Sequence, residues 1–203
     1  MRLHGKEFTM RIILASASPR RKQLLAELYS DFEIITANAD ETLPEGVAIE
    51  EAVSILAMRK GEAVLAASED GSLGEALIIS ADTMVEVDGI PLGKPRDRQE
   101  AFEMLSSLSG REHRVHTGTA VSYRGRCKRG TATTRVFFKA LTPARINAYI
   151  DTGEPFDKAG AYGIQGGAGK FVEKTEGDFD TVVGLSLRLT ASLIKEITEE
   201  SGI

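Results

Sequence analysis

The sequence RIILASASPRRK, at residues 11–22, predicts the unit from which the fold develops. Residues 11–15 are mostly apolar and rich in β-branched side chains, which is typical of a short buried strand. Ser18 suits a helix N-cap, and Pro19 suits the first helical position because a proline loses no hydrogen bond there. We therefore expect a strand, a tight turn and a helix over about residues 19–29.

The rest of the chain alternates strand and helix patterns. The patterns predict strands at 32–36, 77–87, 115–123, 131–139 and 171–172, helices at 49–67, 97–108, 142–152 and 186–199, and an irregular glycine-rich segment at 154–170. Asp88-Gly89 is a strong hairpin signal, with a return arm toward residues 93–95. These elements indicate an α/β fold with a mixed twisted sheet and flanking helices. We expect one domain over residues 10–203, after an N-terminal extension at residues 1–9.

Composition excludes several classes of protein. The chain has 203 residues, 42% of them hydrophobic, which is enough to bury a core. Its formal net charge is −5 and it has no basic block, which disfavours binding to a nucleic-acid duplex. No stretch approaches the roughly 20 apolar residues of a membrane helix, and residues 1–10 lack the apolar core of a signal peptide. Cys127 is the only cysteine and cannot form an internal disulfide. We expect a reducing, cytoplasmic setting, with neither nucleic acid nor membrane as a partner.

Three cations, Arg20, Arg21 and Lys22, occupy the first turn of the first predicted helix, where the helix dipole is already positive. One interpretation is a solvated basic turn, which costs only about a few tenths of a kcal/mol per residue. The other is a bound phosphate group, held by backbone N–H groups, the Ser16 or Ser18 hydroxyl and the guanidinium groups. A phosphate explains the charges and the cap together.

Two more charged residues fall where the pattern predicts burial. Lys60 lies near the centre of the apolar stripe of helix 49–67, and Asp82 interrupts the strand at 77–87. Both residues also have a purely structural interpretation. Lys60 could bury its aliphatic stem and extend its head group to water, and Asp82 could be a hydrogen-bonded aspartate at a strand bend. A shared cleft explains both residues, with Lys94 delivered to it by the hairpin arm.

A polyphosphate is the ligand that these charges fit. A triphosphate carries roughly four negative charges, and the candidate cations are Arg20, Arg21, Lys60 and Lys94. Asp82 and Glu41 then supply oxygen ligands for a divalent cation, Mg²⁺ or Mn²⁺, because such ions bridge carboxylates to substrate phosphates.

Other known motifs do not fit. The chain has no G-x-x-x-x-G-K-[ST] loop, and residues 163–169 do not match G-x-G-x-x-G, which disfavours kinase-type and dinucleotide sites. His113 and His116 lie three apart in a strand pattern, hence on opposite faces, where solvated or core roles are favoured over catalysis. Cys127 has no nearby base in the sequence, and we expect it to be inert.

Four separated motifs resemble the Maf family of nucleoside triphosphate pyrophosphatases. They are LASASPRR at 14–21, ISADTMV at 79–85, LGKP at 92–95 and AGAYGIQG at 159–166. The resemblance spans nearly the whole chain from Met10. It implies an elongated, inosine-triphosphatase-like architecture with two lobes and a central cleft, and often a homodimer. Two departures are Gly61, where an alanine commonly follows the helix lysine, and Ser186, in place of a usual proline.

The resemblance also implies roles for individual residues. Asp82 matches the family's proposed proton acceptor, and Arg20, Thr83 and Gln165 match positions associated with nucleobase selectivity in the dTTP/UTP branch. The other matched cleft residues are Ser16, Arg21, Glu41, Lys60 and Lys94. The implied reaction is hydrolysis of dTTP or UTP, or more broadly of modified pyrimidine nucleotides, between the α and β phosphates. The alternative is a non-catalytic nucleotide-binding regulator of cell division.

Overall fold

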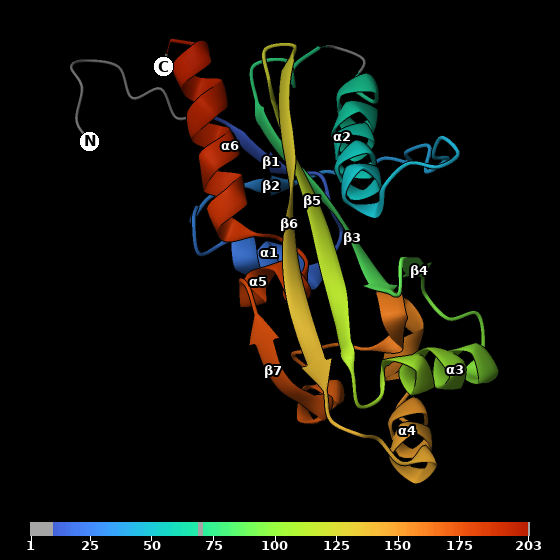
Figure 1. Cartoon of the computed structure of the whole chain (residues 1–203). Helices are drawn as coiled ribbons and strands as arrows, with labels where there is room; N and C mark the ends of the chain where they lie inside the picture. Colours follow the sequence, from blue (N-terminus) through green and yellow to red (C-terminus); the bar gives the residue numbers. More distant parts are fainter. Residues whose placement is uncertain (1–9, 69–70, 203) are drawn as a thin grey trace.

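The computed structural model describes residues 10–68 and 71–202, so the predicted extension at residues 1–9 lies outside the described residues. A mixed sheet of seven strands runs through this part of the chain, in the order β2-β1-β3-β5-β6-β7 with β4 paired to β3 (Figure 1). The strands are β1 Ile12–Leu14, β2 Glu33–Ile34, β3 Leu77–Val87, β4 Ile90–Leu92, β5 Glu112–Tyr123, β6 Arg126–Phe138 and β7 Val172–Glu176. β1 is parallel to β2 and β3, and the other pairs are antiparallel. The predicted α/β class is confirmed.

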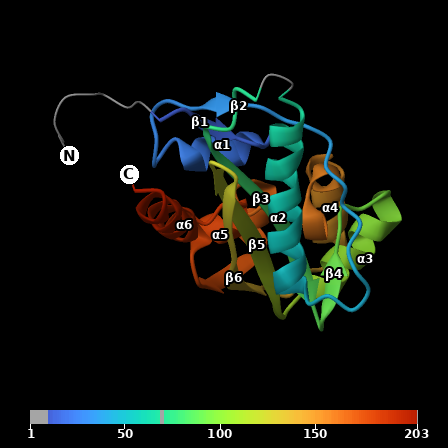
Figure 2. The same cartoon turned by 90° about the horizontal axis from the view of Figure 1, so that it is seen from above.

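The helices cover both faces of the long strands. They are α1 Pro19–Leu25, α2 Ile49–Ala66, α3 Arg98–Leu108, α4 Pro143–Ile150, α5 Phe179–Val183 and α6 Leu187–Glu200, with 3₁₀ helices η1 Glu154–Asp157, η2 Ala159–Ala161 and η3 Gly167–Phe171. α2 packs on one face of β3, β5 and β6, and α6 packs on the other face of β5 and β6 (Figure 2). None of the helices in the described ranges combines the length and apolar character needed to cross a bilayer.

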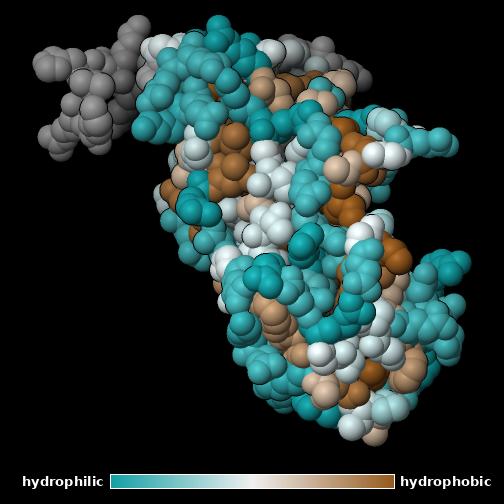
Figure 3. Space-filling view, in the orientation of Figure 1, coloured by the Kyte–Doolittle hydropathy of each residue, from teal (hydrophilic) through white to brown (hydrophobic). Residues whose placement is uncertain are grey.

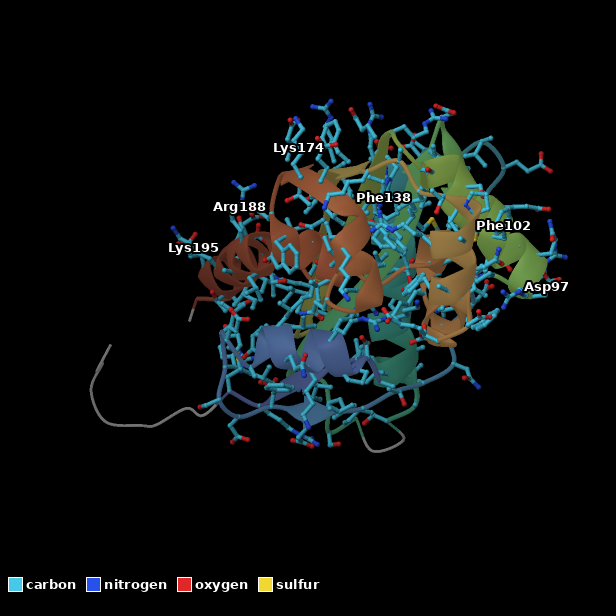
Figure 4. The ribbon with its side chains drawn as sticks, turned by 90° about the horizontal axis from the view of Figure 1, so that it is seen from below. Asp97, Phe102, Phe138, Lys174, Arg188 and Lys195 are labelled. Atoms are coloured by element: carbon cyan, nitrogen blue, oxygen red, sulfur yellow. The ribbon has the colours of Figure 1, made fainter. Side chains whose placement is uncertain are left out.

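Two hydrophobic clusters lie toward opposite ends of the long strands and give the molecule two lobes. One cluster contains Phe138 with side chains of α3 and α4, and the other contains Leu14 with side chains of α1 and α6. Figure 4 shows Phe138 inside the molecule, while Lys174 and Lys195 point outward. The space-filling view shows an elongated molecule with an indentation between its ends (Figure 3). The expected two-lobed form is therefore present within one continuous sheet.

The backbone of α2 rests directly on the sheet. A Cβ atom at Gly118 of β5 would lie 2.2 Å from the Val53 carbonyl oxygen, so only glycine permits this approach. Gly61 has a related role, because a Cβ there would lie 3.0 Å from the Ser80 hydroxyl oxygen. α2 continues through Gly61 without a break. The departure at Gly61 therefore makes room for a side chain of β3.

Several predicted boundaries need correction. α1 ends at Leu25 rather than near Tyr29, because the following N–H groups of Glu27 and Leu28 bond three residues back and tighten the chain. α5 was not predicted, since five residues are too few to show helical periodicity. The hairpin prediction is confirmed: Asp88 and Gly89 have φ angles of 53° and 78°, as the favoured two-residue turn requires.

Candidate functional site

A cleft of about 470 Å³ gathers residues from both halves of the sequence. Its wall includes seven of the predicted site residues: Arg20, Arg21, Lys60, Asp82, Thr83, Lys94 and Gln165. Ser16 and Glu41 line an adjoining hollow that shares Arg21 and Lys60 with the cleft. The structure thus brings all nine predicted positions into one connected region.

Lys60 lies between two carboxylates. It comes from α2 and forms an ion pair with Asp82 of β3, and its Nζ is 3.1 Å from Glu41 Oε1. The side chains of Lys60 and Asp82 are only 23% and 14% exposed, whereas Glu41 is 66% exposed. The expected anionic partner of Lys60 is therefore present.

Arg21 is held by three parts of the chain. Its Nε donates to the Gly184 carbonyl oxygen at 2.8 Å, and its two terminal nitrogens donate to the hydroxyls of Ser16 and Thr83, both at 3.3 Å. Removal from water lowers the pKa of the Arg21 guanidinium, while the nearby Asp82 charge opposes that shift. The guanidinium is therefore fixed in the cleft before any ligand arrives.

Thr83 belongs to a chain of hydrogen bonds that leads to α5. The Thr117 hydroxyl donates to the Thr181 carbonyl oxygen at 2.7 Å, so the Thr83 hydroxyl donates to Thr117 across 2.9 Å. The Thr83 oxygen is then oriented to accept from Arg21. This arrangement fixes the direction of the Thr83 hydroxyl.

Lys94 and Gln165 are the least constrained of the predicted residues. Both are exposed, and within the described part of the chain neither side chain makes a hydrogen bond or an ion pair. The Gly93 carbonyl oxygen accepts from the Gly160 N–H at 3.0 Å, which links the hairpin arm before Lys94 to η2. Both side chains are available to a ligand in the cleft.

Sequence reasoning missed Asp157 and Lys158 on the wall of the cleft. Asp157 Oδ2 lies 3.9 Å from a terminal nitrogen of Arg20, across the opening between α1 and η1. Lys158 donates to Asp157 at 2.5 Å and to the Glu154 carbonyl oxygen at 2.8 Å. The available signal was their position, immediately before the motif at 159–166.

His113 and His116 lie in the interior and outside this site. His113 bonds to the Tyr162 hydroxyl at 2.8 Å, and burial lowers the pKa of His113 to about 4. His116 bonds to Glu86 at 3.0 Å and to Thr133 at 2.9 Å. The core role is confirmed, and the solvated alternative is wrong.

The carboxylates fit a divalent cation only in part. Among the residues described, no group of three or more His, Cys, Asp or Glu side chains surrounds a common point. Asp82 and Glu41 offer two carboxylates on either side of Lys60. Such a pair suits Mg²⁺ or Mn²⁺, which take their remaining ligands from water and substrate phosphates.

Comparison with known proteins adds the family context. Residues 11–197 match the protein family described as "Maf-like protein". A dTTP/UTP pyrophosphatase of Pelotomaculum thermopropionicum is 48% identical over 187 residues, covering 91% of this chain and 95% of that protein. One of Thermococcus gammatolerans is 47% identical over 181 residues, covering 88% of this chain and 92% of that protein. One of Bdellovibrio bacteriovorus is 42% identical over 187 residues, covering 91% of this chain and 97% of that protein.

A solved structure, that of protein VC0702 from Vibrio cholerae, aligns over 95% of this chain and 98% of its own, with 12% identity and a TM-score of 0.48.

Proposed function

The chain belongs to the Maf family, and on that premise we propose that it hydrolyses dTTP and UTP to the nucleoside monophosphate and pyrophosphate. Relatives named dTTP/UTP pyrophosphatase support the choice of substrate. The observation that carries the proposal is the gathering of Arg21, Lys60 and Lys94 with Asp82 on the wall of one cleft. Cations opposite a carboxylate suit cleavage of a phosphoanhydride, which needs charge stabilisation and a proton acceptor.

In the proposed reaction, Asp82 orients a water molecule and accepts its proton as the water oxygen bonds to the α-phosphorus. The bond from the α-phosphorus to the bridging oxygen breaks, and the electron pair leaves with pyrophosphate. Lys60, which already pairs with Asp82, and Lys94, which is unpaired in the described ranges, stabilise the growing negative charge. Arg21 needs no reorganisation, since its guanidinium is already fixed.

Asp82 and Glu41 would hold a divalent cation together with the substrate. When bound, Mg²⁺ or Mn²⁺ supplies neutralisation of phosphate charge and polarisation of the phosphoryl oxygens. Lys60 contacts both carboxylates, so Asp82 and Glu41 would have to release its ammonium group in order to hold a cation. This arrangement predicts competition between Lys60 and the cation for the same oxygens.

Nucleobase selectivity is proposed for Arg20, Thr83 and Gln165. Thymine and uracil present an N–H donor flanked by carbonyl acceptors, and the Gln165 amide offers both a donor and an acceptor. The exposed, unpaired Gln165 side chain supports this role. Ser16 is proposed to contact phosphate, since its hydroxyl and Lys60 border the same hollow.

The experiment that tests the function is pyrophosphate release from dTTP, UTP, CTP, ATP, GTP and 7-methyl-GTP, with and without Mg²⁺ or Mn²⁺. We expect release from dTTP and UTP, and a strong increase with the cation. Orthophosphate as the first product would reject the assigned bond. A regulator without catalysis would bind the nucleotides and release neither product. The carboxylates beside the phosphate-binding lysines and arginines disfavour a regulator, since they weaken binding of a polyanion.

A further inference from the structure

Gln165 is carried by a tight turn whose two ends are fastened to the same pair of side chains. The turn spans residues 163–166 and is closed by a hydrogen bond from the Gly166 N–H to the Gly163 carbonyl oxygen at 3.0 Å. Just outside this bond, the Gly163 N–H donates to the Tyr149 hydroxyl oxygen at 3.1 Å. At the other end, the Gly167 N–H donates to Glu154 Oε2 at 3.0 Å.

The two fastening side chains are bonded to each other. The Tyr149 hydroxyl donates to Glu154 Oε1 at 2.9 Å, so a phenol and a carboxylate form one unit beneath the turn. We call this unit the Tyr149–Glu154 clamp. Neither residue lines the cleft, although Gln165 does. The clamp can therefore reach a ligand only through the turn.

The glycines of the turn show how closely it lies on the clamp. A Cβ atom at Gly166 would lie 2.0 Å from Glu154 Oε1, and one at Gly163 would lie 3.1 Å from the same oxygen. Neither glycine has a positive φ, so the reason for glycine at both positions is space and not backbone conformation. The backbone on either side of Gln165 thus lies close against the Glu154 carboxylate of the clamp.

The clamp itself is anchored in the core. Tyr149 on α4 is 5% exposed, and its ring packs edge-on against Phe171 with centroids 5.2 Å apart. Burial raises the pKa of the Tyr149 hydroxyl well above its usual range, so it remains a donor at neutral pH. The position of the Gln165 backbone is consequently tied to the core.

We propose that the Tyr149–Glu154 clamp is a positioning device that sets nucleobase selectivity by holding Gln165 at one place in the cleft. This inference rests on the proposed function. Thymine and cytosine differ in the order of donors and acceptors on their pairing edge, so an amide discriminates between them only at a fixed distance and direction. A loosened turn lets the amide adapt to either base.

Tyr149→Phe tests the proposal, because it removes the hydroxyl and keeps the ring in the core. We expect the ratio of kcat/KM for dTTP to that for CTP to fall about tenfold, mainly through a higher KM for dTTP. Inhibition by inorganic pyrophosphate should change by less than about twofold, because the phosphate-binding cations are not held by the clamp. Tyr123→Phe is the matched control, since Tyr123 is equally buried on β5 and lies outside the cleft.

A double variant shows whether the clamp acts through Gln165. If it does, adding Tyr149→Phe to Gln165→Ala lowers the dTTP/CTP ratio no further than Gln165→Ala alone. Glu154→Gln, which keeps an acceptor for the Gly167 N–H, should give an intermediate ratio and serves as the second variant if Tyr149→Phe does not fold.

An unchanged ratio in Tyr149→Phe, a further fall in the double variant, or an equal loss of pyrophosphate inhibition would each overturn the proposal. Failure of the proposed function is a different result, because the unmutated chain would then release no pyrophosphate from dTTP or UTP.

Discussion

Lys60 of α2 and Asp82 of β3, separated by 22 residues in the sequence, form an ion pair on the wall of the cleft. Glu41 is the second carboxylate at the same ammonium group, 3.1 Å from it. One positive charge is thus shared by a shielded carboxylate, Asp82, and an exposed one, Glu41. We expect the members of this group to contribute differently to stability and to catalysis. Asp82→Asn and Lys60→Met separate the two contributions.

Asp82→Asn is nearly isosteric and removes the proposed proton acceptor. We expect turnover of dTTP to fall on the order of a hundredfold or more, with nucleotide binding retained. The variant should stay folded, because Glu41 remains as a partner for Lys60. Pyrophosphate release and equilibrium binding of dTTP measure the two effects, with the exposed Asp31→Asn as control. Full turnover in Asp82→Asn would remove Asp82 from the mechanism.

Lys60→Met leaves Asp82 without its ammonium partner. Since both side chains are partly shielded, we expect a loss of about 1–2 kcal/mol in the free energy of unfolding by urea. Asp82→Asn should recover part of that loss in the double variant, because the uncompensated charge is then gone. If the double variant instead loses as much unfolding free energy as the two single variants together, the ion pair makes no net contribution to stability.

Arg21→Lys and Arg20→Lys separate a structural arginine from a ligand-facing one. A lysine cannot reproduce the three contacts of Arg21, so we expect Arg21→Lys to cost about 1–3 kcal/mol of unfolding free energy and to raise KM for dTTP. Among the described residues Arg20 makes only a 3.9 Å ion pair with the exposed Asp157, so Arg20→Lys should leave stability unchanged. Equal destabilisation by the two substitutions would contradict this distinction. Thermal or urea unfolding of both variants provides the measurement.

His113 makes stability depend on pH. Burial lowers its pKa from 6.5 to about 4, so the unfolded chain binds a proton below pH 6.5 that the folded chain does not yet bind. The stabilising contribution is complete above pH 6.5 and is lost as the pH falls to about 4, by about 3 kcal/mol at most. His113→Gln, which retains a hydrogen-bonding group for Tyr162, should flatten the urea-derived stability profile over this interval. The same slope in both proteins would assign it to other groups.

The sequence was most informative where local chemistry decides local structure. The N-cap at Ser18 is confirmed, with its hydroxyl oxygen 3.4 Å from the Arg21 N–H, and the hairpin at Asp88-Gly89 forms as expected. These features depend on a few neighbouring residues and on backbone preferences that a sequence states directly. The single domain over residues 10–203, the homodimer and the cytoplasmic setting stay predictions.

Other features could not be read along the chain. Helical periodicity placed Lys60 on the inward face, but it did not identify which carboxylate lies under that face. Asp157 came from an irregular segment with no periodicity at all. Its distance from Arg20 depends on how the two lobes meet. The Tyr149–Glu154 clamp is also a product of packing, since its bonds join side chains to backbone groups of a distant turn.

The sequence by itself determined the set of chemical groups, the order of most helices and strands, and the resemblance that points to nucleotides. The tertiary structure decided which of these groups meet. Contacts between distant residues depend on how closely α2 approaches the sheet over Gly118 and on which helices cover each end of the long strands. A residue's type and its neighbours fix its local conformation, whereas its partner is fixed by the packing of the whole chain.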